Sequence, residues 1–287
     1  MNAKAKITVK GMILVVSIAL FVWYAFGSLT GNATRGPLQD PYPSRDGPAL
    51  TVAHWNLDVF GVTKAGQETL LQDYASLIDD FDIIFIQEIR DKGGSAFQAL
   101  CALLPQYACK VSNRAGRSSN KEQYGVLYRS ISLETGKTIR LVDWHDYTPD
   151  PQDRWERPPL AVTFSADDYI FTAYTLHVKP AAVQQELADF ENLVTDDDGN
   201  ILLIGDFNAD CTYYTPEQEK EFDRWHWIMR DTADTTVAQS SCAYDRANMN
   251  DEALEEYRKK GIVTIGITEA HSDHYLVWVG LEPEETI

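Results

Sequence analysis

Short apolar runs recur through the chain, and several of the most apolar end at a side chain that can do chemistry. Residues 83–86 read IIFI and lead to Gln87 and Glu88, and residues 201–204 read ILLI and lead to Asp206. A short apolar run of this kind is typical of a strand that is buried on both faces. Strands that end along one rim of a sheet would gather their polar ends around a single pocket.

Helical patterns alternate with these strands. Apolar residues at positions 70, 71, 74, 77 and 78 follow the i, i+3/i+4 spacing of an amphipathic helix and predict one at residues 64–80. Further helices are predicted at residues 95–104 and 181–194. Residues 215–218 read TPEQ, a capping box with Pro at the first helical position, and predict a helix that runs to about residue 229.

The remaining apolar segments predict further strands, so that many strands are mixed with a few helices. This mixture favours stacked sheets flanked by helices. No internal repeat and no second linker interrupts the chain after residue 50, which predicts one domain at residues 50–282 and a short acidic tail at 283–287. The predicted strands beyond the two runs above lie at 50–56, 107–112, 124–129, 138–143, 160–164, 169–176 and 275–280.

The N-terminus predicts export. Residues 11–30 carry no charge and follow Lys4, Lys6 and Lys10. Twenty helical residues span roughly 30 Å, the thickness of the hydrocarbon core of a membrane, and the lysines should stay on the cytoplasmic side. Residues 1–30 are therefore either a cleaved signal peptide or a membrane anchor with the folded domain outside, and residues 31–49 form a linker rich in Pro.

The charge of the chain limits its partners. Asp and Glu number 43 against 25 Lys and Arg, which gives a net charge of −18. A protein that coats nucleic acid needs a broad positive surface, so that class is excluded. Residues 110–129 are the exception, because they hold five basic residues and the single acid Glu122. An enzyme that meets nucleic acid through a local basic patch remains open.

Polar side chains that could activate water lie at the ends of the predicted strands. They comprise carboxylates, amides and two histidines, which are the groups needed for metal-assisted hydrolysis. Any one of them could simply cap a turn, but the whole set predicts a catalytic pocket. The set consists of Asn56, Glu88, His177, Asp206, Asn208, Asp245, Asp273 and His274.

The motifs around these residues resemble the deoxyribonuclease I branch of the endonuclease/exonuclease/phosphatase superfamily. The resemblance covers residues 50–280 in the right order, and GDFNADC, CAYDR and SDHY are its most specific stretches. It implies an α+β sandwich of two stacked, mainly antiparallel sheets flanked by helices. The matching stretches are NLDVFG (56–61), DIIFIQEIRD (82–91), KEQY (121–124), LH (176–177), GDFNADC (205–211), DTT (234–236), CAYDR (242–246) and SDHY (272–275).

The resemblance implies a metal site and two histidine–carboxylate pairs. Asn56, Glu88 and Asp273 would hold a catalytic Mg²⁺, for which Mn²⁺ could substitute, because a hard cation prefers such oxygen ligands. His274 would pair with Asp245 as general base.

His177 would pair with Glu122 as general acid, while Asp206 and Asn208 contact the phosphate or its metal. The reverse assignment of the two histidines, or a proton transfer to Asp206, stays open.

The resemblance also implies the substrate. It predicts a monomeric endodeoxyribonuclease that cuts double-stranded DNA with little sequence preference and leaves 5′-phosphates. Few phosphate contacts imply modest, salt-sensitive affinity. The residues expected to contact DNA are Arg90, Arg117, Arg157 and Tyr213.

The resemblance also bears on disulfides and on calcium sites. Cys211 and Cys242 coincide with the structural disulfide of the family, whereas Cys101 and Cys109 have no counterpart in it and leave a second disulfide open. A structural Ca²⁺ fits Asp234 and Thr236. A second family calcium site fits less well, because residue 158 is Pro where a carboxylate is expected.

Two other functions compete with this hypothesis. One is another phosphoesterase of the same superfamily, such as a sphingomyelinase or an abasic-site endonuclease, although the CAYDR loop and the export signal count against an abasic-site enzyme. A catalytically inactive surface-binding protein would be expected to lack at least one of the catalytic side chains, and all are present.

Overall fold

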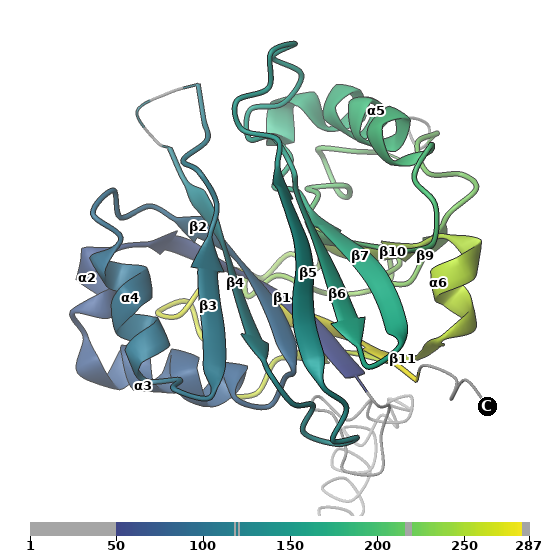
Figure 1. Ribbon diagram of the computed structural model, residues 1–287. Helices are drawn as coiled ribbons and strands as arrows, with labels where there is room; N and C mark the ends of the chain where they lie inside the picture. The colour runs from purple at the N-terminus through teal and green to yellow at the C-terminus, as the bar shows by residue number, and fades with distance from the viewer. Residues whose placement is uncertain (1–49, 118, 120, 216–219, 283–287) are drawn as a thin grey trace, which may run out of the picture. The chain divides into compact units, whose positions relative to one another are not determined.

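The computed structural model describes residues 50–282 except 118, 120 and 216–219, and these residues build two six-stranded β-sheets that stack against each other (Figure 1). The first sheet has the order β11-β12-β1-β2-β4-β3 and the second β5-β6-β7-β8-β10-β9. The strands are β1 (Leu50–Phe60), β2 (Ile83–Ile89), β3 (Tyr107–Val111), β4 (Gln123–Arg129), β5 (Ile139–Asp146), β6 (Leu160–Ala166), β7 (Tyr169–Thr175), β8 (Asn200–Asp206), β9 (His226–Trp227), β10 (Asp245–Met249), β11 (Tyr257–Val263) and β12 (Leu276–Leu281).

Helices cover the outer faces of the sheets. On the first sheet, α3 (Glu68–Ile78) and α4 (Ser95–Ala102) bury their apolar faces in a cluster that includes Trp55 and Trp278, and the short helix α2 (Val62–Ala65) packs only the partly buried Ala65 against it. On the second sheet, the short 3₁₀ helix η1 (Pro180–Ala182) leads into α5 (Val183–Val194), whose Phe190 packs against Phe207. The small helix α6 (Asp251–Glu255) lies beside the edge strands β9 and β11 (Figure 1).

The central core lies between the two sheets. Phe85 from the first sheet meets Phe164 from the second with ring centroids 6.4 Å apart, and both rings are fully buried. Val126, Ile204 and Val277 belong to the same cluster. Burial of apolar surface stabilises by roughly 25 cal/mol per Å², so this layer is a main source of the fold's stability.

The strand directions confirm the predicted fold class and explain where polar ends meet. β1 and β2 run parallel, as do β7 and β8, whereas the other strand pairs of the two sheets are antiparallel. The carboxyl ends of a parallel pair lie at the same edge of a sheet. The two parallel pairs, one in each sheet, therefore point their polar ends at one common rim.

A buried amide joins the two sheets at this rim. The Gln87 side chain leaves β2 and donates to the Leu176 carbonyl at 3.0 Å and to Thr175 Oγ1 at 3.0 Å, and its oxygen accepts from the Asp206 backbone N–H. Gly205 makes this approach feasible, because a Cβ there would lie 2.4 Å from the Leu176 carbonyl oxygen and 2.9 Å from Gln87 Nε2. The Gln87 side chain thus links the two parallel strand pairs directly.

The predicted helix at residues 215–229 is wrong in the part that the structure describes. Residues 221–224 form turns, and His226 and Trp227 pair with β10 as the edge strand β9. Phe222 takes a φ of 58°, which a helix cannot accommodate, and its fully buried ring packs against Phe190. Burial of an aromatic ring therefore outweighs the local helix signal, which rested largely on residues 216–219 outside the described chain.

Most other predicted elements are confirmed with small shifts of their ends. The expected helix at 64–80 is divided at Gly66 into α2 and α3. Besides β9, the elements β10, α6 and β11 were not predicted. β11 reads YRKKGIV, and its charged residues hide the strand pattern because it lies at the edge of the sheet.

The N-terminal predictions concern residues outside the described part of the chain. The signal peptide or anchor at 1–30, the linker at 31–49 and the acidic tail at 283–287 all fall there. Among the described residues, no helix is both long and apolar enough to cross a membrane. Export and membrane attachment stay predictions.

We expect Gly205→Ala to destabilise the fold, because the new Cβ would press on backbone and on Gln87. Overpacking of this kind costs about 1–3 kcal/mol in the free energy of unfolding, to be measured by urea denaturation. Gly61→Ala is the matched control, because the nearest atoms to a Cβ at position 61 are 3.9 Å away. Equal stability of the two variants would contradict the close approach described above.

Candidate active site

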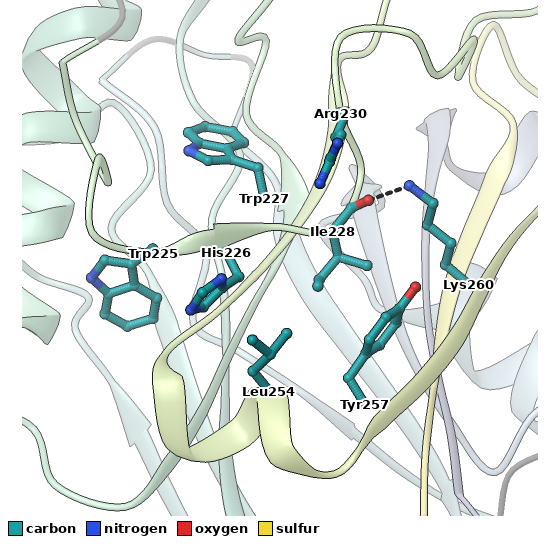
Figure 2. Close-up of a pocket in the computed structure, with 8 residues that line it drawn as sticks. All are labelled: Trp225, His226, Trp227, Ile228, Arg230, Leu254, Tyr257 and Lys260. Carbon is teal, nitrogen blue, oxygen red and sulfur yellow. Dashed lines mark hydrogen bonds between the residues drawn. The ribbon is translucent and has the colours of Figure 1, made fainter.

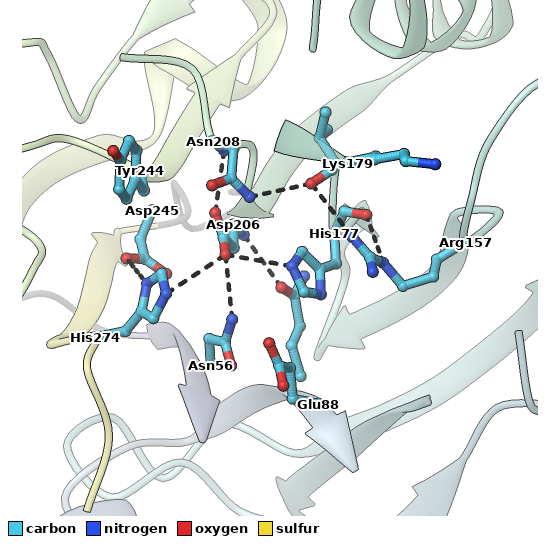
Figure 3. Close-up of polar contacts among 12 residues, drawn as sticks. Asn56, Glu88, Arg157, His177, Lys179, Asp206, Asn208, Tyr244, Asp245 and His274 are labelled. Atoms are coloured by element: carbon cyan, nitrogen blue, oxygen red, sulfur yellow. Dashed lines mark hydrogen bonds and ion pairs between the residues drawn. The ribbon is translucent and has the colours of Figure 1, made fainter. Parts of the chain in front are cut away.

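Side chains from both sheets converge at the common rim (Figure 3). β1 and β2 of the first sheet contribute two of them, and the second sheet contributes the others together with the loops that flank β7 and β12. Asp245 lies opposite Asp206 in the antiparallel register of β8 and β10. The residues that meet here are Asn56, Glu88, His177, Asp206, Asn208, Asp245 and His274.

Asp206 is the centre of the group. Its Oδ2 accepts a hydrogen bond from Asn56 Nδ2 at 3.1 Å and lies 3.4 Å from His177 Nε2 and 3.6 Å from His274 Nε2. Its Oδ1 accepts from the backbone N–H of Asn208. One buried carboxylate therefore stands between two imidazoles, each close enough to exchange a proton with a group bound between them.

His274 and Asp245 form the first predicted pair. His274 Nδ1 lies 2.8 Å from Asp245 Oδ2, and Asp245 is fully buried. Burial alone would lower the pKa of His274, but the charges of Asp245 and Asp206 outweigh it and raise the pKa well above its ordinary value. Burial likewise would raise the pKa of Asp245, yet His274 and the hydrogen bonds that Asp245 accepts hold it well below its usual range.

His177 and Glu122 form the second pair. His177 Nδ1 lies 2.5 Å from Glu122 Oε1. Burial would raise the pKa of Glu122, but His177, Arg157 and Arg90 outweigh burial and lower it. Each histidine thus turns Nδ1 to its own carboxylate and Nε2 to Asp206. Both pairings expected from the sequence are present.

Oxygen ligands for a hard cation gather beside these pairs. Ligand atoms of Glu88, Glu122 and His177 lie within 4.8 Å of one another, and Glu122 Oε2 is buried without a hydrogen bond. Partial burial raises the pKa of the Asp273 carboxyl, and although His274 opposes this, the charges of Asp58 and Glu88 add to it. Carboxylates held close together repel one another, and a divalent cation would relieve that repulsion. This cluster shares only Glu88 with the predicted ligands Asn56, Glu88 and Asp273, and its two carboxylates are ligands that suit Mg²⁺.

The expected DNA-contacting residues differ in their surroundings. Arg157 faces inward, where Nε donates to the His177 carbonyl at 3.0 Å and lies 3.3 Å from Glu122 Oε1. Arg90 bridges Glu88 at 2.8 Å and Glu122 at 3.6 Å. Arg117 pairs with Asp153 at 2.9 Å on the surface. Tyr213 is 42% exposed beside the Asp206 loop and stacks on Tyr244, so its outer ring face is open.

The loops around the site are held by local bonds. The disulfide between Cys211 and Cys242 is present and ties the loop after Asp206 to the segment that leads to Asp245. A second disulfide, which the sequence left open, joins Cys101 to Cys109.

The residues expected to bind calcium lie in a neighbouring segment. Asp234 Oδ1 accepts from Thr236 Oγ1 at 3.2 Å, and Thr236 forms a β-bridge with His274. A cation bound by Asp234 and Thr236 would therefore brace the segment that holds His274.

Two residues of the site were not assigned a role from the sequence. Gln87 was noticed only as part of a motif, although it links the sheets. His54 was not noticed at all, and its Nε2 lies 3.0 Å from Asp245 Oδ1 with both side chains fully buried. The signal available was a histidine within the apolar strand LTVAHWNL, two residues before Asn56.

Comparison with known proteins agrees with this site. The model of the endonuclease/exonuclease/phosphatase family matches residues 53–258. Deoxyribonuclease-1 of Gallus gallus is 30% identical over 264 residues, which cover 81% of this chain and 92% of that protein. Deoxyribonuclease-1 of Homo sapiens is 30% identical over 263 residues, which cover 82% and 93%.

Solved structures agree in fold. An endonuclease/exonuclease/phosphatase from Bacteroides vulgatus has a TM-score of 0.57 at 20% identity, over 82% of this chain and 99% of that one. A mannosyl-6-phosphatase from Bacteroides thetaiotaomicron has a TM-score of 0.55 at 20% identity, over 81% and 99%. These similarities concern the fold alone, whereas the sequence matches concern the family. The chain therefore belongs to the endonuclease/exonuclease/phosphatase family and, within it, to the deoxyribonuclease-1 group.

Proposed function

We propose that this protein is an exported, divalent-metal-dependent endodeoxyribonuclease that hydrolyses double-stranded DNA with little sequence preference and leaves 5′-phosphates. The deoxyribonuclease-1 relatives support the activity, and the two disulfides fit an oxidising compartment. Attachment to a membrane through residues 1–30, and a monomeric state, belong to the same proposal.

The arrangement around Asp206 is the observation that carries the proposal. Hydrolysis of a phosphodiester needs one group that takes a proton from water and another that gives a proton to the leaving oxygen. His177 and His274 approach the same carboxylate oxygen from two sides, at 3.4 Å and 3.6 Å. A phosphate bound next to Asp206 would therefore lie within reach of both imidazoles.

Glu122 and Asp245 serve the histidines by holding them. Each carboxylate accepts from Nδ1, which leaves Nε2 facing the pocket and fixes the ring orientation. Arg157 and Arg90 lie against Glu122 and keep that carboxylate ionised. Asn56 and Asn208 orient Asp206 from opposite ends through its two oxygens.

A metal ion fits beside these groups. Asn56, Glu88 and Asp273 would hold Mg²⁺, or Mn²⁺ in its place, with Asp58 close by. When bound, the cation would supply positive charge that stabilises the charge developing on the phosphate.

The substrate contacts rest on exposed groups near the rim. Tyr213 offers an open ring face, and Arg90 and Arg117 add positive charge to the segment at residues 110–129. Arg157 would act from behind Glu122. A structural Ca²⁺ at Asp234 and Thr236 would brace the His274 segment.

We expect the purified protein to nick supercoiled plasmid in Mg²⁺, and EDTA to abolish nicking. His177→Ala should lower the rate by roughly 10²–10⁴-fold, because a general acid or base of this kind contributes about that much. Gel electrophoresis of the plasmid measures both effects. His145→Ala is the matched control, because His145 is exposed on β5 away from the pocket.

Two results in these assays would overturn the proposed activity. An intact plasmid in Mg²⁺, Mn²⁺ and Ca²⁺, together with cleavage of sphingomyelin or of a duplex with an abasic site, would assign the pocket to another phosphoesterase. Failure to act on any of these substrates would favour a surface-binding protein.

We expect the pH dependence to report which proton His274 moves. Asp245→Asn removes a negative charge that raises the pKa of His274, so that pKa should fall. If His274 is the general base, the acidic limb of the kcat/KM profile moves to lower pH. If it is the general acid, the alkaline limb moves to lower pH instead.

The activity of Asp245→Asn should also fall by roughly 10²-fold or more, because the histidine loses its partner. Asp251→Asn is the control, since Asp251 pairs with a histidine outside the pocket. A profile in which neither limb moves would exclude His274 from proton transfer.

A further inference from the structure

A second pocket opens at the free edges of the two sheets, away from the catalytic residues. β9 is the edge strand of the second sheet and β11 that of the first, and α6 lies between them. The pocket has a volume of about 580 Å³, within the range of small-molecule sites. Figure 2 shows Trp225, Trp227, Arg230, Tyr257 and Lys260 around it.

Among the residues that the structure describes, Arg230 and Lys260 of this pocket have no acidic partner, whereas His226, which also lines it, lies 2.7 Å from Asp251 Oδ1. Lys260 Nζ donates to the Ile228 carbonyl, and the Arg230 guanidinium makes no hydrogen bond or ion pair with any residue that the structure describes. No carboxylate lines the pocket within that same part of the chain. Burial lowers the pKa of Lys260, and the charge of Arg230 lowers it further.

Two neighbouring basic side chains without a carboxylate in the pocket lining stand out in a chain with 43 acids and 25 bases. Two neighbouring positive charges, one of them half-buried, disfavour the empty pocket. A bound anion would relieve this repulsion.

Aromatic rings supply the other walls. Trp225 and Trp227 are half-buried, and Phe222 fixes them from behind with ring centroids 5.5 Å and 6.4 Å away. Tyr257 closes the opposite side beside Lys260 (Figure 2). A flat base that stacks on such a ring gains about 1–3 kcal/mol. The walls therefore suit a ligand that has both an anionic group and an aromatic ring.

We propose that this pocket binds a nucleoside 5′-monophosphate, either free or as the terminal nucleotide of a DNA strand. Arg230 and Lys260 take the phosphate, and the indole or phenol rings take the base. Trp227 and Arg230 also line a smaller cavity with Ala209, Arg246 and Asp231, whose carboxylate pairs with Arg246 at 2.7 Å. Ala209 and Arg246 directly follow Asn208 and Asp245 in the sequence. The ligand would therefore lie behind the catalytic loops. This binding does not depend on the proposed nuclease activity.

Tryptophan fluorescence of the full-length protein in EDTA tests this proposal, because no hydrolysis occurs there. Deoxyadenosine 5′-monophosphate should quench the fluorescence to saturation, and deoxyadenosine should bind about tenfold more weakly or worse. Arg230→Ala and Lys260→Gln should each weaken the nucleotide by a similar factor. Arg224→Ala, an exposed arginine outside the pocket, should leave it unchanged.

Competition distinguishes the two sources of the ligand. If a 5′-phosphorylated oligothymidylate displaces the nucleotide and the unphosphorylated strand does not, the pocket accepts strand ends. If neither displaces it, the ligand is the free nucleotide. Absence of saturation, or an affinity that His177→Ala weakens and Arg230→Ala does not, would overturn the proposal.

A separate observation concerns Asp245, whose carboxylate lies between two histidines. Oδ2 faces His274 at 2.8 Å and Oδ1 faces His54 at 3.0 Å. The Asp245 carboxylate is ionised and can only accept, so His54 must carry its hydrogen on Nε2. His54 Nδ1 is buried without a partner. A hydrogen on that nitrogen would be a buried donor without an acceptor, which costs free energy.

We infer that His54 is a positioning residue for the reaction, and this inference rests on the proposed function. His54 comes from β1 and Asp245 from β10, so their bond reaches from one sheet to the other. It prevents the carboxylate from rotating and keeps Oδ2 directed at His274. Without it, the buried Oδ1 would lose its hydrogen bond and the His274 ring would lose its fixed orientation.

Steady-state kinetics of plasmid nicking test this role. His54→Phe should lower kcat by about tenfold or more with KM unchanged, because a misplaced catalytic group slows the chemical step. His54→Gln, which can still donate to Asp245, should recover part of kcat. A folded His54→Phe protein with unchanged kcat would overturn the inference.

Nitrogen-15 NMR of the histidines, with His54→Gln used to assign the signals, gives a readout that needs no activity. We expect the ring signals that disappear in His54→Gln to be those of a histidine that carries a hydrogen on Nε2. If the signals that disappear in His54→Gln belong instead to a ring protonated at Nδ1, the inference is overturned. A wild-type protein that shows the Nε2–H signal but does not nick DNA would instead contradict the proposed function.

Discussion

The contact between Gln87 and the strands of the opposite sheet is the constraint on which the site depends. Catalytic groups come from both sheets, so their distances are set by how the sheets dock at the rim. The buried Gln87 amide helps to fix that docking by bonding to β7, to the Leu176 carbonyl and to the Asp206 backbone, and the Asn56–Asp206 and His54–Asp245 bonds also join the two sheets. Gly205 leaves the space for the Gln87 side chain. Asp206 can therefore stand midway between His177 and His274.

The docking of the two sheets also brings several carboxylates close together at the rim. The chain is strongly acidic, yet each buried carboxylate of the two histidine pairs is compensated by basic side chains. Asp245 is held by two histidines, and Glu122 by one histidine and two arginines. The acids at the rim, Glu88 and Asp273 among them, suit a cation. Negative charge is thus used to hold positive groups, and DNA would meet only local positive patches.

The sequence predicts the sheets and the two histidine pairs well, because buried strands are encoded locally and the motifs are specific. The sequence does not predict features that depend on contacts between residues far apart in the chain. Phe222 leaves the predicted helix because its burial against Phe190 outweighs local capping. β11 is hidden by its charges at the sheet edge. Arg157 faces inward and His54 joins the site, and both facts arise from packing between segments far apart in the chain.

The central claim is that both histidines act on one phosphate held beside Asp206. The most direct measurement compares nicking rates of His177→Ala, His274→Ala and the double variant. If the histidines serve one reaction, the double variant should be little slower than the slower single variant, because groups that act as a unit are strongly non-additive. Losses that multiply, or a single variant with the wild-type rate, would contradict the account.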